Sequence, residues 1–341
     1  AVTPGIWGRR SDAGKDLPRK GGKPVKLFDL HCDTLYECVV QGQELYANTL
    51  HLDLVRGHRY APWAQVFAVW TPDTLRGEAA WAACLRVLRF AREQEERFPD
   101  SFSVIRDLAG LDAAFEKGAC AGILGLESGA PLNGSLEYLD RCAAEGVRVV
   151  TLTWNGENEL GGGSGCDPEA GLTSFGREAV RRMEKRGIVP DVSHLNRRGF
   201  WDTAEQAEGP FIASHSVFSS VHPHPRNLGD EQFREIVRRG GLVGLNLCRD
   251  QLGTPVGEST FDCLRRHLEH GWELGGENTL AIGCDLDGTQ LPPEWGGISV
   301  MEALYRYLLS KNYEESLLER LFFGNSYDFF RIALTRGAPI E

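Results

Sequence analysis

Histidine and carboxylate residues follow directly after several short apolar segments of the chain. The segment Lys26–Leu30 runs into His31-Cys32-Asp33, in which the two polar residues are two positions apart. Side chains of a strand alternate between its faces, so His31 and Asp33 can point to the same side. Imidazole and carboxylate groups are common metal ligands. This pair is therefore the first candidate for a metal site.

Four further candidates occupy the same position relative to other apolar segments. They are Glu127 after Ala121–Leu126, His194 after Ile188–Val192, His215 after Phe211–Ala213, and Asp285 with Asp287 after Leu280–Gly283. A single histidine or acid at such a place is more often a structural residue or a helix cap than a ligand. Three imidazoles and several carboxylates gathered without a cation would leave buried charge that is costly to hold. Together, these residues predict a metal centre.

Short apolar segments alternate with helical patterns along the whole chain. Eight segments are expected to be strands of a parallel sheet, buried on both faces: Lys26–Leu30, Ala64–Trp70, Ala121–Leu126, Val147–Thr153, Ile188–Val192, Phe211–Ala213, Leu242–Leu247 and Leu280–Gly283. Helices are expected at Ala79–Phe98, Phe175–Arg186, Asp230–Arg239 and Glu315–Leu334.

Eight strand–helix units in 341 residues favour an α/β chain with a single (β/α)8 TIM-type barrel. The carboxyl ends of its strands would bring the candidate ligands to one face. A doubly wound open sheet is the alternative architecture. Its dinucleotide-binding form is disfavoured, because no glycine-rich phosphate loop follows the first strand.

The ligand types indicate which metal the centre would hold. Imidazole and carboxylate without thiolate suit zinc in a catalytic site, with manganese, iron or cobalt as substitutes. Two divalent ions would bring four positive charges. Asp33 and Glu127 would bring two negative charges and a bridging hydroxide one more, which leaves a net charge of about +1. Such a centre supplies hydroxide near neutral pH and stabilises the oxyanion formed when an amide is attacked.

The composition limits the compartment and the partners. With 37 basic and 48 acidic residues, the formal charge is −11, which argues against nucleic acid or an anionic membrane as partner. Nine scattered cysteines without a CxxC pair indicate reduced thiols and a cytoplasmic location. Residues 1–25 lack the apolar segment of a secretory signal and are expected to be a flexible leader before a barrel at 26–341. The sequence is compatible with a monomer and with a homodimer.

Eight sequence motifs follow one another between about Lys26 and Ala333. They are FDLHCDT (28–34), GILGLESG (122–129), VVTLTWN (149–155), GLTSFGREAV (171–180), DVSHLN (191–196), IASHS (212–216), HPRNL (224–228) and AIGCDLDG (281–288). In content and order they resemble the membrane dipeptidase (renal dipeptidase) family of zinc metallopeptidases, within the amidohydrolase superfamily. The resemblance implies a metal-dependent (β/α)8 barrel, in agreement with the strand count.

The resemblance also implies a ligand set with two zinc ions per chain. It places His31 and Asp33 on one ion and His194 and His215 on the other, with Glu127 bridging both. The chain would then be a metallodipeptidase that uses a metal-bridging hydroxide to cut dipeptides with a free C-terminal carboxylate.

Other site residues follow from the same resemblance. Asp285 matches the acid that handles the proton of the bridging water and of the leaving amine, and Arg226 matches the arginine that holds the substrate carboxylate. Trp154 stands where better-known members carry a histidine over the substrate carbonyl, and Trp154 and Asn155 are both expected to bind substrate. An indole can donate one hydrogen bond but cannot take a proton. Its bulk is expected to favour small residues beside the scissile bond.

Two other functions are compatible with these residues. One is hydrolysis of a different small amide, such as an N-acyl amino acid, a cyclic imide or a β-lactam. The other is a catalytically silent protein that binds a metal or a ligand. The acid Asp285 favours activity over silence, and Arg226 favours a substrate that bears a carboxylate. A departure from the family occurs at Asn246–Arg249, where a tyrosine usually assists that carboxylate.

Overall fold

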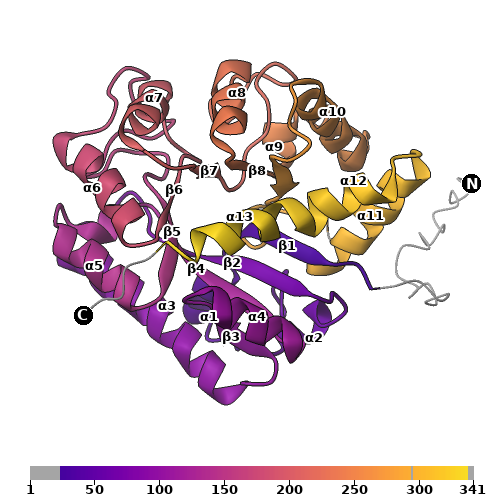
Figure 1. Cartoon of the computed structure of the whole chain (residues 1–341), viewed down its shortest axis with the longest axis horizontal. Coiled ribbons are helices and arrows are strands. Elements are labelled where there is room, and N and C mark those ends of the chain that lie inside the picture. Colours follow the sequence, from indigo (N-terminus) through magenta and orange to yellow (C-terminus); the bar gives the residue numbers. More distant parts are fainter. Residues whose placement is uncertain (1–23, 293–294, 337–341) are drawn as a thin grey trace, which may run out of the picture.

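The computed structural model describes residues 24–292 and 295–336, and it shows a closed barrel of eight parallel strands surrounded by helices (Figure 1). The barrel strands are β1 (Leu27–Cys32), β2 (Trp63–Trp70), β4 (Cys120–Glu127), β5 (Val147–Thr151), β6 (Val189–Asp191), β7 (Ile212–Ala213), β8 (Leu242–Leu245) and β9 (Leu280–Ile282). Their order is β2-β1-β9-β8-β7-β6-β5-β4, and pairing of β2 with β4 closes the ring. The predicted barrel is confirmed, and each predicted strand corresponds to one of these eight. Most of the expected leader, 1–25, lies outside the described residues.

A ninth strand, β3 (Phe102–Val104), was not expected from the sequence. It pairs with residues 120–122 of β4, whereas β5 pairs with β4 from Leu124 onward. Because β2 follows β4 from Ala121 to Glu127, β3 shares the other edge of β4 with β5. The strand therefore extends the sheet beside the start of β4 and leaves the eight-stranded ring unchanged.

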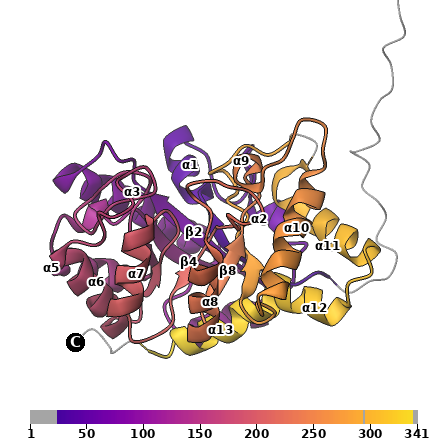
Figure 2. The same ribbon diagram turned by 90° about the horizontal axis from the view of Figure 1, so that it is seen from above.

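The helices pack around this ring (Figures 1 and 2). They are α1 (Thr34–Gln41), α2 (Leu54–Gly57), α3 (Gly77–Arg97), α4 (Leu108–Glu116), α5 (Leu136–Ala144), α6 (Ser174–Lys185), α7 (Arg197–Gln206), α8 (Asp230–Arg239), α9 (Arg249–Leu252), α10 (Thr260–Glu273), α11 (Val300–Ser310), α12 (Glu315–Glu319) and α13 (Asn325–Ala333). Three predicted helices correspond to α3, α6 and α8. The predicted helix at Glu315–Leu334 is interrupted by a π-helical turn, η4 (Arg320–Gly324), between α12 and α13.

The C-terminal helices cover the end of the barrel where the strands begin. Phe28 of β1 stacks on Phe330 of α13 with ring centroids 5.1 Å apart, and Phe323 of η4 lies 6.3 Å from Phe28. Figure 2 shows α13 on one side of the strands and α1 and α9 on the opposite side. Since α1 and α9 follow the ends of β1 and β8, the mouth of the barrel is the face with the predicted ligands. Among residues 24–292 and 295–336, no helix has both the length and the hydropathy that a membrane-crossing segment requires.

Candidate metal centre

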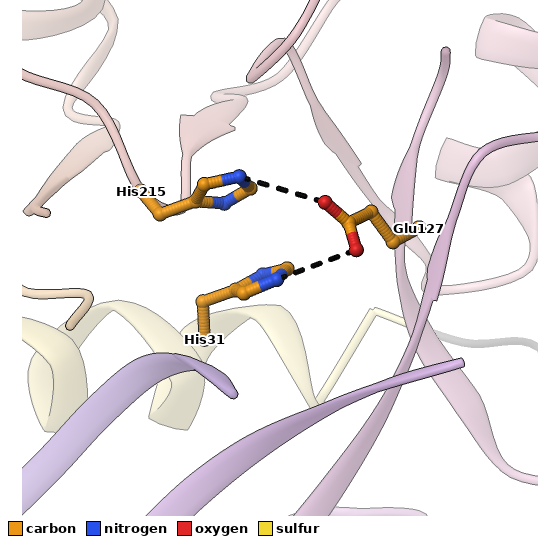
Figure 3. A group of neighbouring side chains, drawn as sticks. All are labelled: His31, Glu127 and His215. Carbon is orange, nitrogen blue, oxygen red and sulfur yellow. Dashed lines mark ion pairs between the residues drawn. The ribbon is translucent and has the colours of Figure 1, made fainter. Parts of the chain in front are cut away.

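Three of the predicted ligands meet at the mouth of the barrel from three different strands. His31 lies in β1, Glu127 ends β4 and His215 follows β7. The Nε2 atom of His31 lies 3.7 Å from Glu127 Oε2, and that of His215 lies 3.6 Å from Glu127 Oε1. Figure 3 shows both imidazoles directed at this carboxylate. All three side chains are buried.

The remaining candidates complete two groups on either side of Glu127. On the side of His31, the Nε2 atom lies 3.6 Å from Asp33 Oδ2 and 4.0 Å from Asp285 Oδ1. On the other side, His194 Nε2 lies 3.0 Å from Glu127 Oε1. One oxygen of Glu127 thus faces His31 and the other faces His194 and His215. The structure brings all of the sequence-predicted ligands together.

Hydrogen bonds to the Nδ1 atoms of His194 and His215 determine which nitrogen of each ring carries the proton. His194 Nδ1 lies 2.9 Å from Asn155 Oδ1, which can only accept. His215 Nδ1 lies 2.8 Å from Ser214 Oγ, and this hydroxyl donates its own proton to Asp191 Oδ2 at 2.6 Å. Both neutral imidazoles therefore carry their proton on Nδ1. Such orienting partners are typical of metal-binding histidines.

The other nitrogen of each ring then has a free electron pair. His194 Nε2 and His215 Nε2 lie 2.9 Å apart, so two electron pairs face each other unless a cation lies beside them. On the opposite side of Glu127, His31 Nε2 and Asp33 Oδ1 are buried and have no hydrogen-bond partner within the part of the chain that the structure describes. Buried polar atoms are rarely left unbonded, because that costs about 1–3 kcal/mol. These contacts fit metal ions with nitrogen and oxygen ligands.

The electrostatics of the cluster also favour a cation. Burial and then the charge of Glu127 raise the pKa of Asp33 well above its usual value. Burial would lower the pKa of His31, but the charges of Glu127 and Asp33 outweigh it and raise that pKa well above normal. Burial lowers the pKa of His194 to about 4. A positive charge is thus stabilised beside His31 and these carboxylates, where a metal ion would replace the proton.

Asp285 approaches the cluster from a turn with unusual backbone geometry. Its φ of 61° lies in the left-handed region, which is uncommon for residues other than glycine. A Cβ atom on Gly288 would lie 2.2 Å from both Asp285 Oδ1 and Asp33 Oδ2. Glycine at 288 is therefore needed for the two carboxylates to approach. Burial raises the pKa of Asp285 to about 6, against the opposing charge of His31.

The second acid of the GxDxDG segment has a different environment. Asp287 Oδ2 accepts a hydrogen bond from Thr34 Oγ1 at 2.5 Å, and Oδ1 accepts one from the backbone N–H of His51 at 2.7 Å. Both oxygens are thus engaged in joining separate segments of the chain. The geometry distinguishes Asp285, which faces the ligands, from Asp287, which holds the loops together.

A cavity of about 470 Å³ opens over the ligands. Trp154 lines it, with its ring centroid 5.2 Å from that of Trp70 and 6.1 Å from that of His194. Arg226 also lines it, with a buried Nη2 that has no hydrogen-bond partner among the described residues. Burial lowers the pKa of Arg226 to about 10, so its guanidinium stays charged at neutral pH.

Some residues of the site have roles that the sequence did not indicate. Asn155, expected to bind substrate, lines the cavity and also holds the ring of His194. Asp191 and Ser214 orient His215, and Asn246 donates to Asp285. Their positions in the sequence could have pointed to two of these residues. Ser214 directly precedes the predicted ligand His215, and Asn246 follows β8 just as the predicted ligands follow their strands.

Comparisons with known proteins show the family of the chain. The family model described as "Membrane dipeptidase (Peptidase family M19)" matches residues 22–336. The chain is 31% identical over 226 residues to an uncharacterized protein in the pqqA 5′ region of Klebsiella pneumoniae, covering 64% of this chain and 83% of that one. It is 30% identical over 188 residues to an uncharacterized dipeptidase of Schizosaccharomyces pombe, covering 53% of this chain and only 45% of the yeast protein.

Two solved structures share the fold over almost their whole length. One is a metallopeptidase from Rhodobacter sphaeroides liganded with a phosphinate mimic of the dipeptide L-Ala-D-Ala. It is 26% identical with a TM-score of 0.83, covering 93% of this chain and 100% of that chain. The other, dipeptidase AC, a metallopeptidase of family M19, is 27% identical with a TM-score of 0.83, covering 92% and 99%. The family match confirms the resemblance seen in the sequence, and the chain belongs to the membrane dipeptidase family, peptidase family M19.

Proposed function

We propose that the chain is a zinc metallodipeptidase with two zinc ions per chain, which hydrolyses dipeptides that have a free C-terminal carboxylate. The observation that carries this proposal is the position of Arg226. Its buried, charged guanidinium shares one cavity with the ligand cluster, and its Nη2 has no hydrogen-bond partner in residues 24–292 and 295–336. A planar guanidinium binds a carboxylate at two points. The Rhodobacter relative, which holds a dipeptide mimic, supports a ligand of this size.

Different residues around the cavity then bind the metal ions and transfer the proton during hydrolysis. Bound divalent ions would lower the pKa of a coordinated water and polarise the peptide carbonyl. Glu127 and the four other predicted ligands would hold these ions in place. Asp285 Oδ1 faces this cluster, where the carboxylate can take the proton of the attacking water and return it to the leaving amine.

Substrate binding falls to residues of the cavity wall. Arg226 holds the C-terminal carboxylate, which fixes the scissile bond over the ligand cluster. Trp154 lies beside His194, where its indole N–H can donate a hydrogen bond to the substrate. A substrate without a carboxylate would leave the charge of Arg226 buried and unpaired, which is costly. This cost favours dipeptides over cyclic imides and other neutral amides.

Hydrolysis of a dipeptide library by zinc-loaded protein tests the proposal, with both L,L and L,D members present. We expect two free amino acids to be released in equal amounts from a subset of the library. Cleavage of N-acyl amino acids, cyclic imides or β-lactams in the absence of any dipeptide cleavage would contradict the dipeptidase assignment.

Arg226→Lys tests the carboxylate contact separately. Lysine keeps the charge but loses the two-point geometry, so kcat/KM for free-acid dipeptides should fall roughly 10- to 100-fold, in line with the loss of a charged hydrogen bond. The same dipeptides with a C-terminal amide should change little, because they lack the anionic partner. Arg306→Lys, on the exterior helix α11, is the matched control and should affect neither substrate. Equal losses on acids and amides would mean that Arg226 has a structural role.

A further inference from the structure

Asn246 is a buried polar residue beside the metal ligands to which no step of the reaction assigns a role. It directly follows β8 and precedes α9, and its side chain is fully buried. Both ends of its amide are hydrogen-bonded. Oδ1 accepts from the backbone N–H of Cys248 at 2.7 Å, and Nδ2 donates to Asp285 Oδ2 at 3.3 Å.

The direction of this amide is fixed by the backbone. An N–H group can only donate, so the end of Asn246 that faces the N–H of Cys248 must be the oxygen. The amide nitrogen therefore has to face Asp285. The fold thus places a hydrogen-bond donor beside one oxygen of the Asp285 carboxylate. If the Asn246 amide were turned by half a rotation, it would lose the hydrogen bonds to both Cys248 and Asp285.

The two oxygens of Asp285 consequently have different neighbours. Oδ2 accepts from Asn246, while Oδ1 faces His31 Nε2 at 4.0 Å, within the ligand group of His31 and Asp33. Within residues 24–292 and 295–336, Asn246 is the only side chain that donates a hydrogen bond to this carboxylate. Gly288, beside Oδ1, has no side chain that could restrain it.

We propose that Asn246 is the positioning residue for proton transfer: it holds the Asp285 carboxylate with Oδ1 directed at the ligand cluster. The inference rests on the proposed function, in which Asp285 moves the proton. Among the described residues, Asn246 has no hydrogen bond to a predicted metal ligand, and it acts through Asp285. Without the hydrogen bond from Asn246, the Asp285 carboxylate turns away from the attacking water. Proton transfer then occurs in a smaller fraction of the bound substrate molecules.

Two substitutions of Asn246 separate positioning from loop anchoring. Asn246→Asp keeps the shape and the acceptor for the N–H of Cys248 but replaces the donor to Asp285 with a carboxylate that repels it. Asn246→Leu removes both contacts without adding charge. For both variants we expect kcat to fall roughly 10- to 100-fold, as for other orienting partners of a metal site. KM and the metal content by elemental analysis should stay within about threefold of wild type, since carboxylate binding and the ligands are unchanged.

Crystal structures of the same variants provide a readout that does not depend on activity. The Asp285 carboxylate should be rotated, or distributed over two orientations, in both variants. If Asn246→Asp keeps the wild-type kcat while Asn246→Leu loses it, the anchoring of the Cys248 backbone is what matters, and the proposal is wrong. An unrotated Asp285 in both structures would overturn it as well.

Asn325→Leu is the matched control for loss of a buried amide. Asn325 is equally buried, but its Nδ2 donates to the backbone oxygens of Glu277 and Leu280, away from Asp285. This variant should melt at a lower temperature and keep its kcat; an equal loss of kcat would point to general destabilisation. If the wild-type protein cleaves no dipeptide, only the proposed function is contradicted. The inference about Asn246 is still tested by the orientation of Asp285 in the crystal structures.

Discussion

Asp285→Asn should lower kcat for dipeptide hydrolysis by about 10²- to 10⁴-fold, the range typical of a lost acid–base group. Asparagine has nearly the same shape as aspartate, but it cannot accept and return a proton at neutral pH. The five predicted ligands, Glu127 and the four residues around it, are unchanged by the substitution. The metal content should therefore stay close to that of wild type, which separates a loss of proton transfer from a loss of the metal centre.

Asp287→Asn is the matched control for this experiment. Asp287 belongs to the same GxDxDG segment, but its oxygens accept from Thr34 and from the backbone of His51. Its substitution should lower the melting temperature, while kcat falls far less than in Asp285→Asn. Steady-state kinetics with elemental analysis of both variants decides between the two acids. Full activity of Asp285→Asn together with loss of activity in Asp287→Asn would reverse the assignment.

Glu127→Ala should remove both metal ions, and with them the hydrolytic activity. One oxygen of Glu127 faces His31, while the other lies 3.0 Å from His194 and 3.6 Å from His215. Its loss therefore takes a ligand from each group, whereas loss of a single histidine affects only one. Elemental analysis should give about two ions per chain for wild type and clearly fewer for Glu127→Ala than for His31→Ala or His215→Ala. Full metal content in Glu127→Ala would contradict a bridging role.

The barrel could be predicted because its strands have a local signature. Each is a short, continuous apolar segment, which is what burial on both faces of a parallel sheet requires. The strand β3 was missed because three residues, Phe102–Val104, are too short to show a period. The π-helical turn at Arg320–Gly324 was missed for a related reason. The apolar pattern of Glu315–Leu334 is continuous, and a local change of hydrogen-bond register leaves little trace in it.

The meeting of the predicted ligands could be foreseen because strand ends in a barrel converge on one face. The residues that orient them could not, since their roles depend on hydrogen bonds between segments far apart in sequence. Asn155 contacts His194 across 39 positions, and Asn246 contacts Asp285 across the same separation. An asparagine after a strand gives no indication of which group its amide meets. The resemblance already favoured Asp285 over Asp287, but the physical reason, that Thr34 and His51 engage both oxygens of Asp287, came only from the fold.

Titration of metal-free protein with zinc, while dipeptide hydrolysis is measured, tests the two-metal dipeptidase most directly. The protein is stripped with a chelator, and the rate is followed as zinc is added. We expect no hydrolysis without metal and a rise that ends at about two equivalents per chain, because both sides of Glu127 must be filled to hold and activate the water. Hydrolysis by the stripped protein, or a plateau at one equivalent, would contradict the two-metal mechanism.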